Sequence, residues 1–589
     1  MKEFFKFMFA SMLGYFLIMI IMSLLFFALI MAAVSFTQTE EVVVNDNSVL
    51  TLSLGYDIKD RTETIPVNFM FDFSSLNPKP GLIQILNSID KAARDERIKG
   101  IYLELADLPS GMATIQEIRN ALEEFKSSGK FIYAYGNIYT QKAYYLASVA
   151  DKVFLNPEGF IEIRGFRGEV TFIKGLLDKL GIEAQIMRHG KFKSAVEPLM
   201  REDMSEANRE QTLAFISSMW DDVSMEMATN RKMDIASLND IADFLKAQHP
   251  EEAYQLGIVD SLIFKDQLLE MLADKIDVDL IRKENLISAG SYDKAYVSNG
   301  EKRSRNKIAV IYAEGDIVQG DATQDAIGSE GISRAIRNVR LDGSYKALVL
   351  RVNSPGGDGI ASDIILREMK LVNEIMPVVV SMGNYAASGG YYISCSADKI
   401  VAQPTTITGS IGVFGIIPNF KEFFNEKLGV TFDGVGTNKN SDYISVNKPL
   451  SDFQREVIQS DVERFYQTFI THVAEGRGMT TESVDDIGQG RVWTGTDALQ
   501  KGLVDQLGGL NDAIALAAEL ANLDDYRTVD LPERKEAFEQ LLEDLLGENT
   551  ETRLLKQELG EFYGLYEYVE QVKNTSGIQT RLPYYITIE

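Results

Sequence analysis

The 589-residue sequence predicts an α/β fold in which two tandem copies of one domain follow an N-terminal membrane helix. Three observations support this prediction: a long apolar segment at the N-terminus, an internal repeat, and a regular alternation of short apolar strands with amphipathic helices. The length agrees with it, because 589 residues are too many for a single hydrophobic core.

The N-terminal segment has the composition of a membrane anchor. Lys2, Glu3 and Lys6 precede an uncharged stretch, residues 7–39, that is rich in Phe, Leu, Ile and Met. A spanning helix needs about 20 apolar residues, whereas the core of a signal peptide has only about 7–15. Residues 1–39 are therefore predicted to be a cytoplasmic tip and an uncleaved transmembrane anchor. Cleavage after the small residues near its end is the alternative.

The charges before the anchor predict its orientation. Lys2 and Lys6 favour the cytoplasmic side for the short N-terminal end. We therefore expect a single-pass protein of the bacterial inner membrane, with the bulk of the chain on the periplasmic side.

The internal repeat covers a large part of each half. Residues 99–152 align without gaps with residues 346–399, and residues 253–262 resemble residues 498–507. A period of this length is too long for a solenoid unit, so it indicates a duplicated domain. The identical positions include Gly136/Gly383, Asn137/Asn384, Tyr144/Tyr391, Tyr145/Tyr392 and Asp151/Asp398.

Strands and helices alternate in each half. In the second half, residues 307–317, 347–354 and 377–384 are apolar runs typical of buried strands, and residues 329–340 and 361–375 have helical spacing. Such alternation predicts parallel strands joined by crossover helices. The expected divisions are a first domain at 47–287, a linker at 288–305, a second domain at 306–525 and a helical extension at 526–589, with helices at 533–547 and 550–573.

Charge and composition exclude several classes of function. The net charge of −27 repels phosphate groups, so we expect no nucleic acid partner and no flat binding to anionic lipid. Cys395 is the only cysteine, so the chain has no intramolecular disulfide. We expect no metal and no cofactor, because the glycine-rich loops lack the Lys-Ser/Thr pair of a nucleotide-binding P-loop.

Ser388 is the candidate nucleophile. It lies in the segment NYAASGGYYI, between a predicted strand and a predicted helix, where a hydroxyl can be presented at the edge of a sheet. The alternative is that these small residues only allow close helix packing. The loop RVNSPGGDG adds Gly356 and Gly357, whose N–H groups can point into the same crevice as an oxyanion hole.

A serine nucleophile needs a base, and Lys193 is the candidate. Of the three histidines, His249 and His472 are expected at the surface, while His189 lies in RHGKFKSAVEP beside Lys193. Apolar neighbours surround Lys193, and burial lowers the pKa of a lysine from about 10.4 toward neutrality. The alternative for this basic run is a solvated loop.

Four segments, GKFKSAVEP, NSPGGDG, NYAASGGYY and TGSIGV, carry a resemblance to the signal peptide peptidase A family, in its long, membrane-anchored form with two domains. The resemblance extends from the anchor to the second domain and implies a serine–lysine endopeptidase with two crotonase/Clp-protease-like domains. It implies that Ser388 is the nucleophile, Lys193 the general base and Ser410 the residue that orients the lysine. It further implies that Gly357 and Gly389 supply the oxyanion N–H groups.

The repeat supports one composite site per chain. The first half has Gln141 where the second has Ser388, whereas the second half has Ser441 where the first has Lys193. The first half therefore retains the lysine without the serine, and the second retains the serine without that lysine. Lys191 and Lys439 remain rival bases.

The expected function is degradation of cleaved signal peptides and other apolar peptides at the membrane. The resemblance also implies a closed homo-oligomer, for which we expect a tetramer, since two homologous domains can pair head-to-tail between chains. The alternatives are a non-hydrolytic crotonase-like membrane scaffold or acyl-binding protein, and a thioester-binding crotonase enzyme. The latter explains the glycines but not the lysine.

Overall fold

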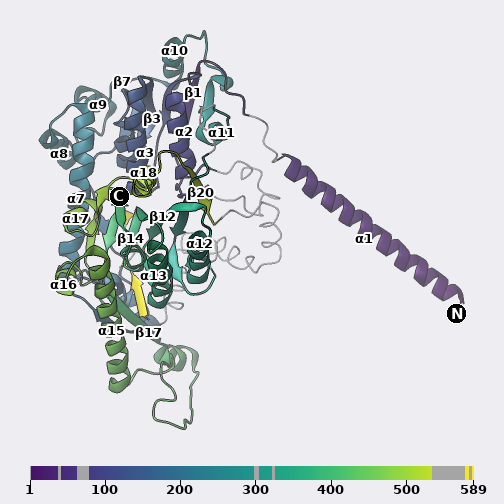
Figure 1. Ribbon diagram of the computed structural model, residues 1–589, viewed down its shortest axis with the longest axis vertical. Coiled ribbons are helices and arrows are strands. Elements are labelled where there is room, and N and C mark those ends of the chain that lie inside the picture. The colour runs from purple at the N-terminus through teal and green to yellow at the C-terminus, as the bar shows by residue number, and fades with distance from the viewer. Residues whose placement is uncertain are drawn as a thin grey trace.

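The computed structural model describes residues 2–36, 42–62, 79–297, 304–321, 326–532, 578–582 and 587–588. Helix α1 (Lys2–Phe36) projects away from the rest of the molecule as a single helix (Figure 1). Residues Glu3–Leu25 have a mean hydropathy of 2.2 and none of this window is buried. The helix is therefore long and apolar enough to anchor the chain in a membrane, as predicted.

The first half contains a six-stranded, fully parallel sheet in the order β7-β4-β3-β2-β1-β8. Its strands are β1 (Ser48–Ser53), β2 (Ile98–Glu104), β3 (Phe131–Tyr139), β4 (Lys152–Ile161), β7 (Ser261–Leu262) and β8 (Leu286–Ser288). Its helices are α2 (Leu82–Arg94), α3 (Met112–Phe125), α4 (Gln141–Ala147), α7 (Glu206–Arg231), α8 (Ile235–Phe244), α9 (Pro250–Gln255), α10 (Lys265–Ile276) and α11 (Ala289–Tyr292), with the 3₁₀ turns η3 (Lys126–Ser128) and η5 (Lys283–Asn285).

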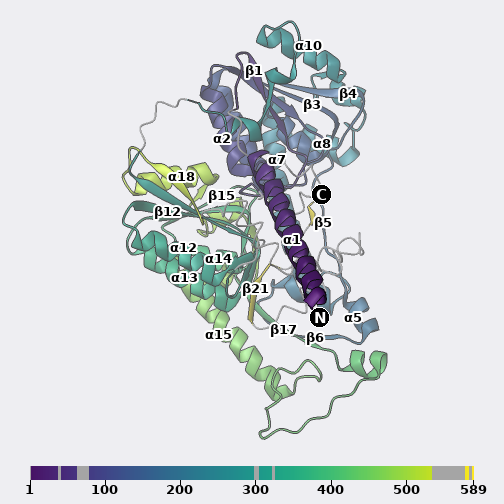
Figure 2. The ribbon, with the colours of Figure 1, turned by 90° about the vertical axis from the view of Figure 1, so that its right-hand side faces the viewer.

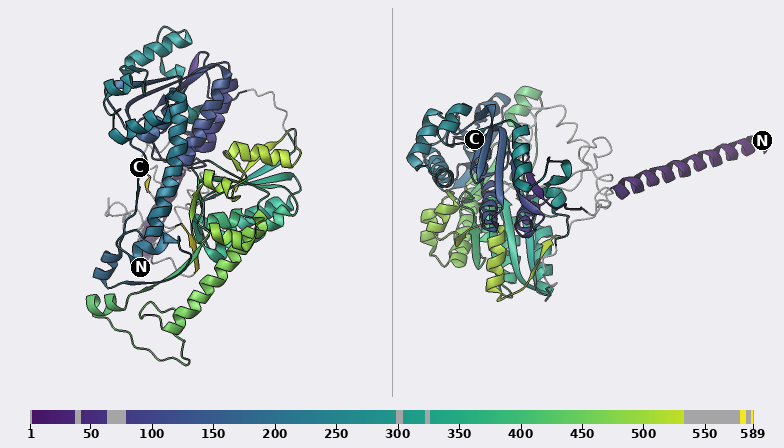
Figure 3. Two further views of the ribbon diagram at one scale, coloured as in Figure 1. Left: turned by 90° about the vertical axis from the view of Figure 1, so that its left-hand side faces the viewer. Right: turned by 90° about the horizontal axis from the view of Figure 1, so that it is seen from above.

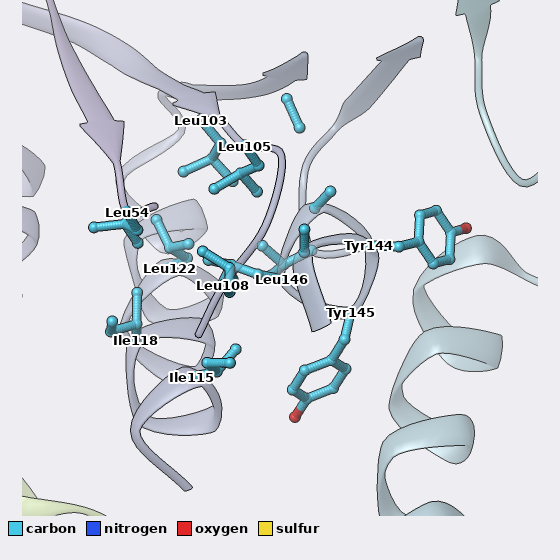
Figure 4. Close-up of a cluster of buried hydrophobic side chains, with 14 of the residues drawn as sticks. Leu54, Leu103, Leu105, Leu108, Ile115, Ile118, Leu122, Tyr144, Tyr145 and Leu146 are labelled. Atoms are coloured by element: carbon cyan, nitrogen blue, oxygen red, sulfur yellow. The ribbon is translucent and has the colours of Figure 1, made fainter. Parts of the chain in front are cut away.

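Both faces of this sheet are covered, which explains why its strands read as continuous apolar runs. On one face, α2, α3, α4 and α7 form the main core with leucines and isoleucines of the strands. Figure 4 shows part of this core, where Leu103 and Leu105 lie above Ile115 and Leu122 of α3. On the other face, α10 packs Leu268 against aromatic side chains of the sheet.

The second half has a similar sheet in the order β18-β16-β14-β12-β9-β20, with β15 beside β14 and β19 beside β15. Unlike the first sheet, it has one antiparallel pair, between β16 and β18. Its strands are β9 (Lys307–Glu314), β12 (Tyr345–Ser354), β14 (Val378–Ala387), β15 (Lys399–Ala402), β16 (Ile407–Gly409), β18 (Val492–Thr494), β19 (Gln506–Leu507) and β20 (Arg527–Leu531). Its helices are α12 (Ser329–Leu341), α13 (Gly359–Asn373), α14 (Gly389–Ser394), α15 (Asp452–Arg477), α16 (Thr481–Ile487), α17 (Gly495–Gln500) and α18 (Leu510–Leu520), with a π-helical turn η6 (Phe423–Leu428).

Each half also contains a hydrogen bond that is equivalent to one in the other half. The hydroxyl of Tyr144 donates to the Ile258 carbonyl, and the hydroxyl of its counterpart Tyr391 donates to the Leu503 carbonyl, both at 2.9 Å. The predicted class, α/β with a duplicated domain after an apolar N-terminal helix, is confirmed.

Ordered structure continues past two of the expected divisions. β20 pairs in parallel with β9, so the second sheet extends beyond residue 525. α11 packs on α2 within the expected linker, where Ser88 Oγ donates to the Ala289 carbonyl at 3.1 Å. The helices expected at 533–547 and 550–573 lie outside the described residues.

A third sheet joins the two halves, in the order β11-β10-β13-β21-β17-β6. β6 of the first half pairs antiparallel with β17 of the second, in a register that runs from Glu183↔Asn419 to His189↔Val413. Figure 2 shows β6 and β17 side by side. The strands are β6 (Glu183–His189), β10 (Asp316–Val318), β11 (Ala326–Gly328), β13 (Gly356–Asp358), β17 (Val413–Asn419) and β21 (Ile578–Arg581).

Short elements complete the fold beside this sheet. They are β5 (Gly168–Glu169), which pairs with β22 (Thr587–Ile588), the helices α5 (Lys174–Leu180) and α6 (Glu197–Met200), and the 3₁₀ turn η4 (Ser194–Val196). The molecule is elongated (Figure 3). The sheet of the first half lies toward one end of the long axis, and α15 of the second half lies toward the opposite end.

A buried cation also links the halves. Arg351 on β12 is fully buried, and its guanidinium donates to Asp60 Oδ1 at 3.0 Å and to Glu117 Oε2 at 2.9 Å, both in the first half. The two carboxylates are at most 4% exposed. Loss of one member of such a group leaves uncompensated charge in a medium that solvates it poorly.

Arg351→Met is therefore expected to lower the free energy of unfolding by about 3–5 kcal/mol. Denaturant titration of the detergent-solubilised chain, followed by tryptophan fluorescence, measures this loss. Arg334→Met is the matched control, because Arg334 pairs with Asp321 at 2.9 Å while both side chains are more than half exposed. The control is expected to cost less than about 1 kcal/mol. Equal effects of the two substitutions would contradict the assignment of Arg351 to the junction.

Candidate active site

Ser388 occupies the sharp turn between β14 and α14. Its side chain is fully buried, and its backbone lies at φ 54°, ψ −113°, which is uncommon for a residue with a Cβ. Its N–H donates to the Gly409 carbonyl at 2.8 Å, which holds the turn against β16. Strain of this kind persists only where the surrounding structure enforces it, so the position of the hydroxyl is fixed by its neighbours.

Lys193 reaches Ser388 from the other half of the chain. It follows β6 and precedes η4, and its side chain is fully buried. Its Nζ lies 2.7 Å from Ser388 Oγ. The same Nζ lies 3.1 Å from both the carbonyl oxygen and Oγ of Ser410. The three polar groups therefore surround one nitrogen at hydrogen-bond distance.

Two glycines make room for the lysine. A Cβ on Gly490, which has φ +80°, would lie 2.6 Å from the backbone of Lys193. A Cβ on Gly412 would lie 3.1 Å from Cδ of the same lysine. The Phe414 ring, with its centroid 5.9 Å from Nζ, covers another side. The stem of Lys193 thus runs through a channel that is closed by backbone and by an aromatic ring.

Burial lowers the pKa of Lys193 well below its usual value. No ion pair joins Lys193 to a carboxylate within the described ranges, so no negative charge offsets the cost of burying an ammonium group. A neutral amine has a lone pair, so it can accept the proton of the Ser388 hydroxyl. The arrangement is that of a serine with a base already in contact with it.

Ser410 is held as firmly as Ser388. It too has a positive φ, 51°, and its N–H donates to the Arg491 carbonyl at 2.7 Å. With its carbonyl and hydroxyl both directed at Nζ, it fixes the direction from which the lysine approaches the serine.

The glycines predicted for the oxyanion hole lie in closely packed positions. Gly357 is part of β13, where a Cβ would meet the Ile317 carbonyl oxygen at 2.1 Å. Gly389 directly follows Ser388, and a Cβ there would meet Ser362 Oγ at 2.8 Å. Neither position has space for a larger residue.

The rival bases do not share the environment of the buried serine. Lys191 is exposed, with its Nζ over the ring of Phe192, and Lys439 is exposed in the loop after η6. His189 stacks on Tyr466 with ring centroids 3.9 Å apart. Among the described residues, no cluster of His, Cys, Asp or Glu could hold a metal ion.

Gln141, the counterpart of Ser388 in the first half, has a structural role. Its Oε1 accepts hydrogen bonds from the N–H groups of Arg164 and Gly165 at 2.8 and 2.9 Å, and its Nε2 donates to the Gly165 carbonyl. The amide thus ties down the loop that corresponds to the one containing Gly412. In the first half, a buried side chain whose polar atoms are hydrogen-bonded therefore stands at the position equivalent to Ser388.

Sequence reasoning missed two parts of this site. Gly490 and the strand β21 both contact it, and neither was predicted. The short run Gly-Gln-Gly at 488–490 was the only local signal for Gly490. No local signal pointed to β21, because it is a four-residue strand that comes from a distant part of the chain.

Comparison with known proteins places the chain among peptidases. The family model of "Peptidase family S49" matches residues 124–279 and 370–524. The chain is 41% identical to "Protease 4" of Salmonella typhi over 461 residues, which cover 75% of this chain and 72% of that protein. It is 33% identical to "Serine protease SPPA, chloroplastic" of Arabidopsis thaliana over 92% of this chain and 78% of that protein. Among solved structures, a mutant of ClpP1 from Listeria monocytogenes is 16% identical over 35% of this chain and 94% of its own, with a TM-score of 0.24.

The close approach of Gly490 to Lys193 can be tested. Gly490→Ala places a methyl group against the lysine backbone, and a displacement of about 1 Å at a reacting group costs about 100-fold in rate. We expect kcat/KM for peptide cleavage to fall by about that factor. Gly502→Ala is the matched control, because Gly502 has a similar φ of +75° but nothing within 4 Å of the place that a Cβ would take. Similar losses in both variants would mean that backbone strain, and not the contact with Lys193, is responsible.

Proposed function

The chain belongs to peptidase family S49, and we propose that it cleaves peptides with Ser388 as nucleophile and Lys193 as general base. Family membership makes it a serine peptidase and confirms the resemblance seen in its motifs. One observation carries the assignment of roles: a fully buried lysine, without a carboxylate partner among the described residues, lies 2.7 Å from a fully buried serine hydroxyl.

In the proposed mechanism, Lys193 takes the proton of Ser388 as Oγ attacks the carbonyl carbon of the peptide. The N–H groups of Gly357 and Gly389 stabilise the resulting oxyanion. The lysine then returns the proton to the leaving amine, and an acyl-serine remains. Lys193 next activates a water molecule that hydrolyses the ester. Ser410 keeps the amine directed at Oγ throughout.

The substrates that we propose are cleaved signal peptides and other apolar peptides. The apolar helix α1 supports this proposal, because it would hold the site close to the membrane in which such peptides remain. In our proposal the first domain supplies the base and the second the nucleophile, so each chain has one composite site. We further propose a homotetramer that encloses its sites and excludes folded proteins.

The alternative proposal, a crotonase-like scaffold or acyl-binding protein, explains the closely packed glycines near Ser388 but not Lys193. Burying a lysine without a compensating charge costs stability, and a scaffold gains nothing from that cost. The geometry therefore favours the hydrolase.

Substitution of the two side chains tests the proposed roles. Ser388→Ala and Lys193→Met are each expected to lower kcat for cleavage of an apolar fluorogenic peptide by at least about 10⁴-fold. Lys193→Met is also expected to raise the thermal midpoint at neutral pH, since the methionine side chain carries no amine that must be desolvated. Lys191→Met and Lys439→Met are the matched controls and should retain activity. Loss of activity in a control, with activity retained in Lys193→Met, would reassign the base.

The pH dependence follows from the direction of the Lys193 pKa shift. The amine acts only when neutral, and burial lowers its pKa well below 10.5. We therefore expect kcat/KM to rise with pH and to reach its plateau far below pH 10.5. A profile that rises only near the usual lysine pKa would mean that the working base is solvated.

Accessibility to added protease tests the orientation. We propose that the chain after residue 40 faces the periplasm. Protease added to intact spheroplasts should then digest this part, while a cytoplasmic marker protein stays intact. Protection of the chain until the membrane is dissolved would place the catalytic part in the cytoplasm.

A further inference from the structure

Both halves of the chain hold the backbone of the loop that carries Lys193. The N–H of Phe192 donates to the Gln489 carbonyl of the second half at 2.9 Å. The Phe192 carbonyl accepts from the N–H of Ser194 at 2.8 Å, which closes a tight turn around the lysine. Arg188 of β6 donates to the Lys193 carbonyl at 3.4 Å. The backbone is therefore held on both sides of the lysine.

One buried amide connects this loop with a strand of the second half. Gln211 lies on α7 and is 2% exposed. Its Nε2 donates to the Phe192 carbonyl at 3.0 Å and to Ser194 Oγ at 2.8 Å, on the two sides of Lys193. Its Oε1 accepts from the N–H of Val492, on β18, at 3.4 Å. A single side chain thus bridges the lysine loop and β18.

The segment around Val492 also fixes the two serines of the site. The carbonyl of Arg491, the preceding residue, accepts from the N–H of Ser410 at 2.7 Å. Val492 itself lies opposite Gly409 in the pairing of β18 with β16. The Gly409 carbonyl in turn accepts from the N–H of Ser388 at 2.8 Å. The bridge therefore ties the lysine loop to the pair of strands that positions both hydroxyl groups.

A buried chain of hydrogen bonds fixes the orientation of the bridging amide. Glu197 Oε2 accepts from Asn208 Nδ2 and from the N–H of Ser205, both at 3.1 Å, and Arg188 lies 4.0 Å from the same carboxylate. Because a carboxylate only accepts, it directs the Asn208 carbonyl oxygen toward Gln211, whose Nε2 donates to it at 3.3 Å. The NH2 group of Gln211 therefore faces the lysine loop.

An ion pair from the neighbouring residue of α7 lies outside this bridge. Glu210 pairs with Arg491 at 3.2 Å, and the Arg491 guanidinium lies 4.7 Å from the centroid of the Phe192 ring. The Glu210 side chain is 51% exposed, and exposed ion pairs contribute little to stability. The buried amide is therefore the contact that we expect to place the loop.

We propose that Gln211 is a positioning residue, whose amide holds the backbone around Lys193 in register with the strands that fix Ser388 and Ser410. This inference rests on the proposed function, because it takes Lys193 as the general base. Gln211 acts through the backbone on either side of the lysine and not on the reacting atoms themselves. A displacement of about 1 Å at a reacting group costs about 100-fold in rate, so loss of the bridge is costly for catalysis.

Gln211→Met tests the proposal in the full chain in detergent micelles, with an apolar fluorogenic peptide as substrate. Methionine has a similar shape but can neither donate to the lysine loop nor accept strongly from Val492. We expect kcat to fall about 100-fold while KM stays unchanged. A raised KM at unchanged kcat would mean that Gln211 acts on substrate binding, and it would overturn the proposal.

Gln141→Met is the matched control. Gln141 is also a buried glutamine of the first half, and its amide makes three hydrogen bonds to the backbone of one loop, at the position equivalent to Ser388. Both substitutions should lower the thermal midpoint, because each leaves buried backbone groups unpaired. Only Gln211→Met should lower kcat. Equal losses of kcat, measured where both variants are folded, would indicate general destabilisation instead of positioning.

Ser194→Ala covers the case in which Gln211→Met does not fold. This substitution removes one of the two acceptors for Gln211 in the loop and keeps the backbone turn. It should lower kcat about fivefold, the effect of one hydrogen bond, with KM unchanged. A Ser194→Ala enzyme with the kcat of the wild type would contradict the proposal.

The pH profile gives a readout that a merely structural role would not move. Burial lowers the pKa of Lys193, and a loop that is no longer held lets water reach the amine. The pKa of Lys193 should then rise toward its usual value. The plateau of kcat/KM is therefore expected at higher pH in Gln211→Met than in the wild type or in Gln141→Met. An unshifted profile would overturn the proposal.

Thermal unfolding separates this proposal from the proposed function. An amine with a lowered pKa in the folded state makes stability rise with pH from that pKa up to the usual 10.5. The thermal midpoint relative to Lys193→Met should show this rise, which should begin at higher pH when Gln211 is also replaced by methionine. The same onset in both backgrounds would overturn the proposal even if Ser388-dependent cleavage is found. If the wild type shows no such cleavage, the proposed function fails, while a shifted onset still supports Gln211 as the residue that positions Lys193.

Discussion

The pairing of β6 with β17 is the interaction on which the site depends. Seven residues of each half lie opposite one another in this antiparallel ladder. β6 ends just before Lys193, so the register of the ladder decides where that side chain enters the second half. A slip of one residue would turn every side chain of β6 to the opposite face of the sheet. The register is secured by apolar packing around it, in which Val196, Leu199 and Phe414 are buried together.

The site is costly for the fold in two ways. Lys193 loses its hydration without gaining a charge partner in the described part of the chain, and Ser388 and Ser410 both adopt positive φ. Large cores on both sheets offset these costs, since fully buried side chains line both faces of each. The stability of the cores thus supports a local arrangement that would be unfavourable by itself.

The two halves differ at the equivalent positions of the site. Gln141 stands in the first half where Ser388 stands in the second, and its amide joins two segments of backbone. The second half retains the serines but receives its lysine across the junction. The buried Arg351, paired with Asp60 and Glu117, holds that junction from the other side. The two halves are therefore joined both at the Lys193–Ser388 contact and at this buried ion cluster.

The sequence by itself determined the α/β class, the duplication and the apolar N-terminal helix. Each of these features follows from local periodicity or from similarity between segments. Both can be read from the sequence without knowing which residues are neighbours in space. It also singled out Ser388 and Lys193, because small residues, apolar neighbours and complementary losses mark them in the chain, whereas Ser410 came only from the resemblance of its segment to the peptidase family.

Only the tertiary structure decided what surrounds these residues. The third sheet is assembled from short strands that lie far apart in the sequence. No local pattern therefore predicted the pairing of β6 with β17 or the position of β21. The contact between Gly490 and Lys193, and the position of Thr580 beside Gly389, arise from that assembly. The physical reason is that backbone pairing between distant strands depends on which edges the packed cores bring together, and side-chain periodicity does not encode that choice.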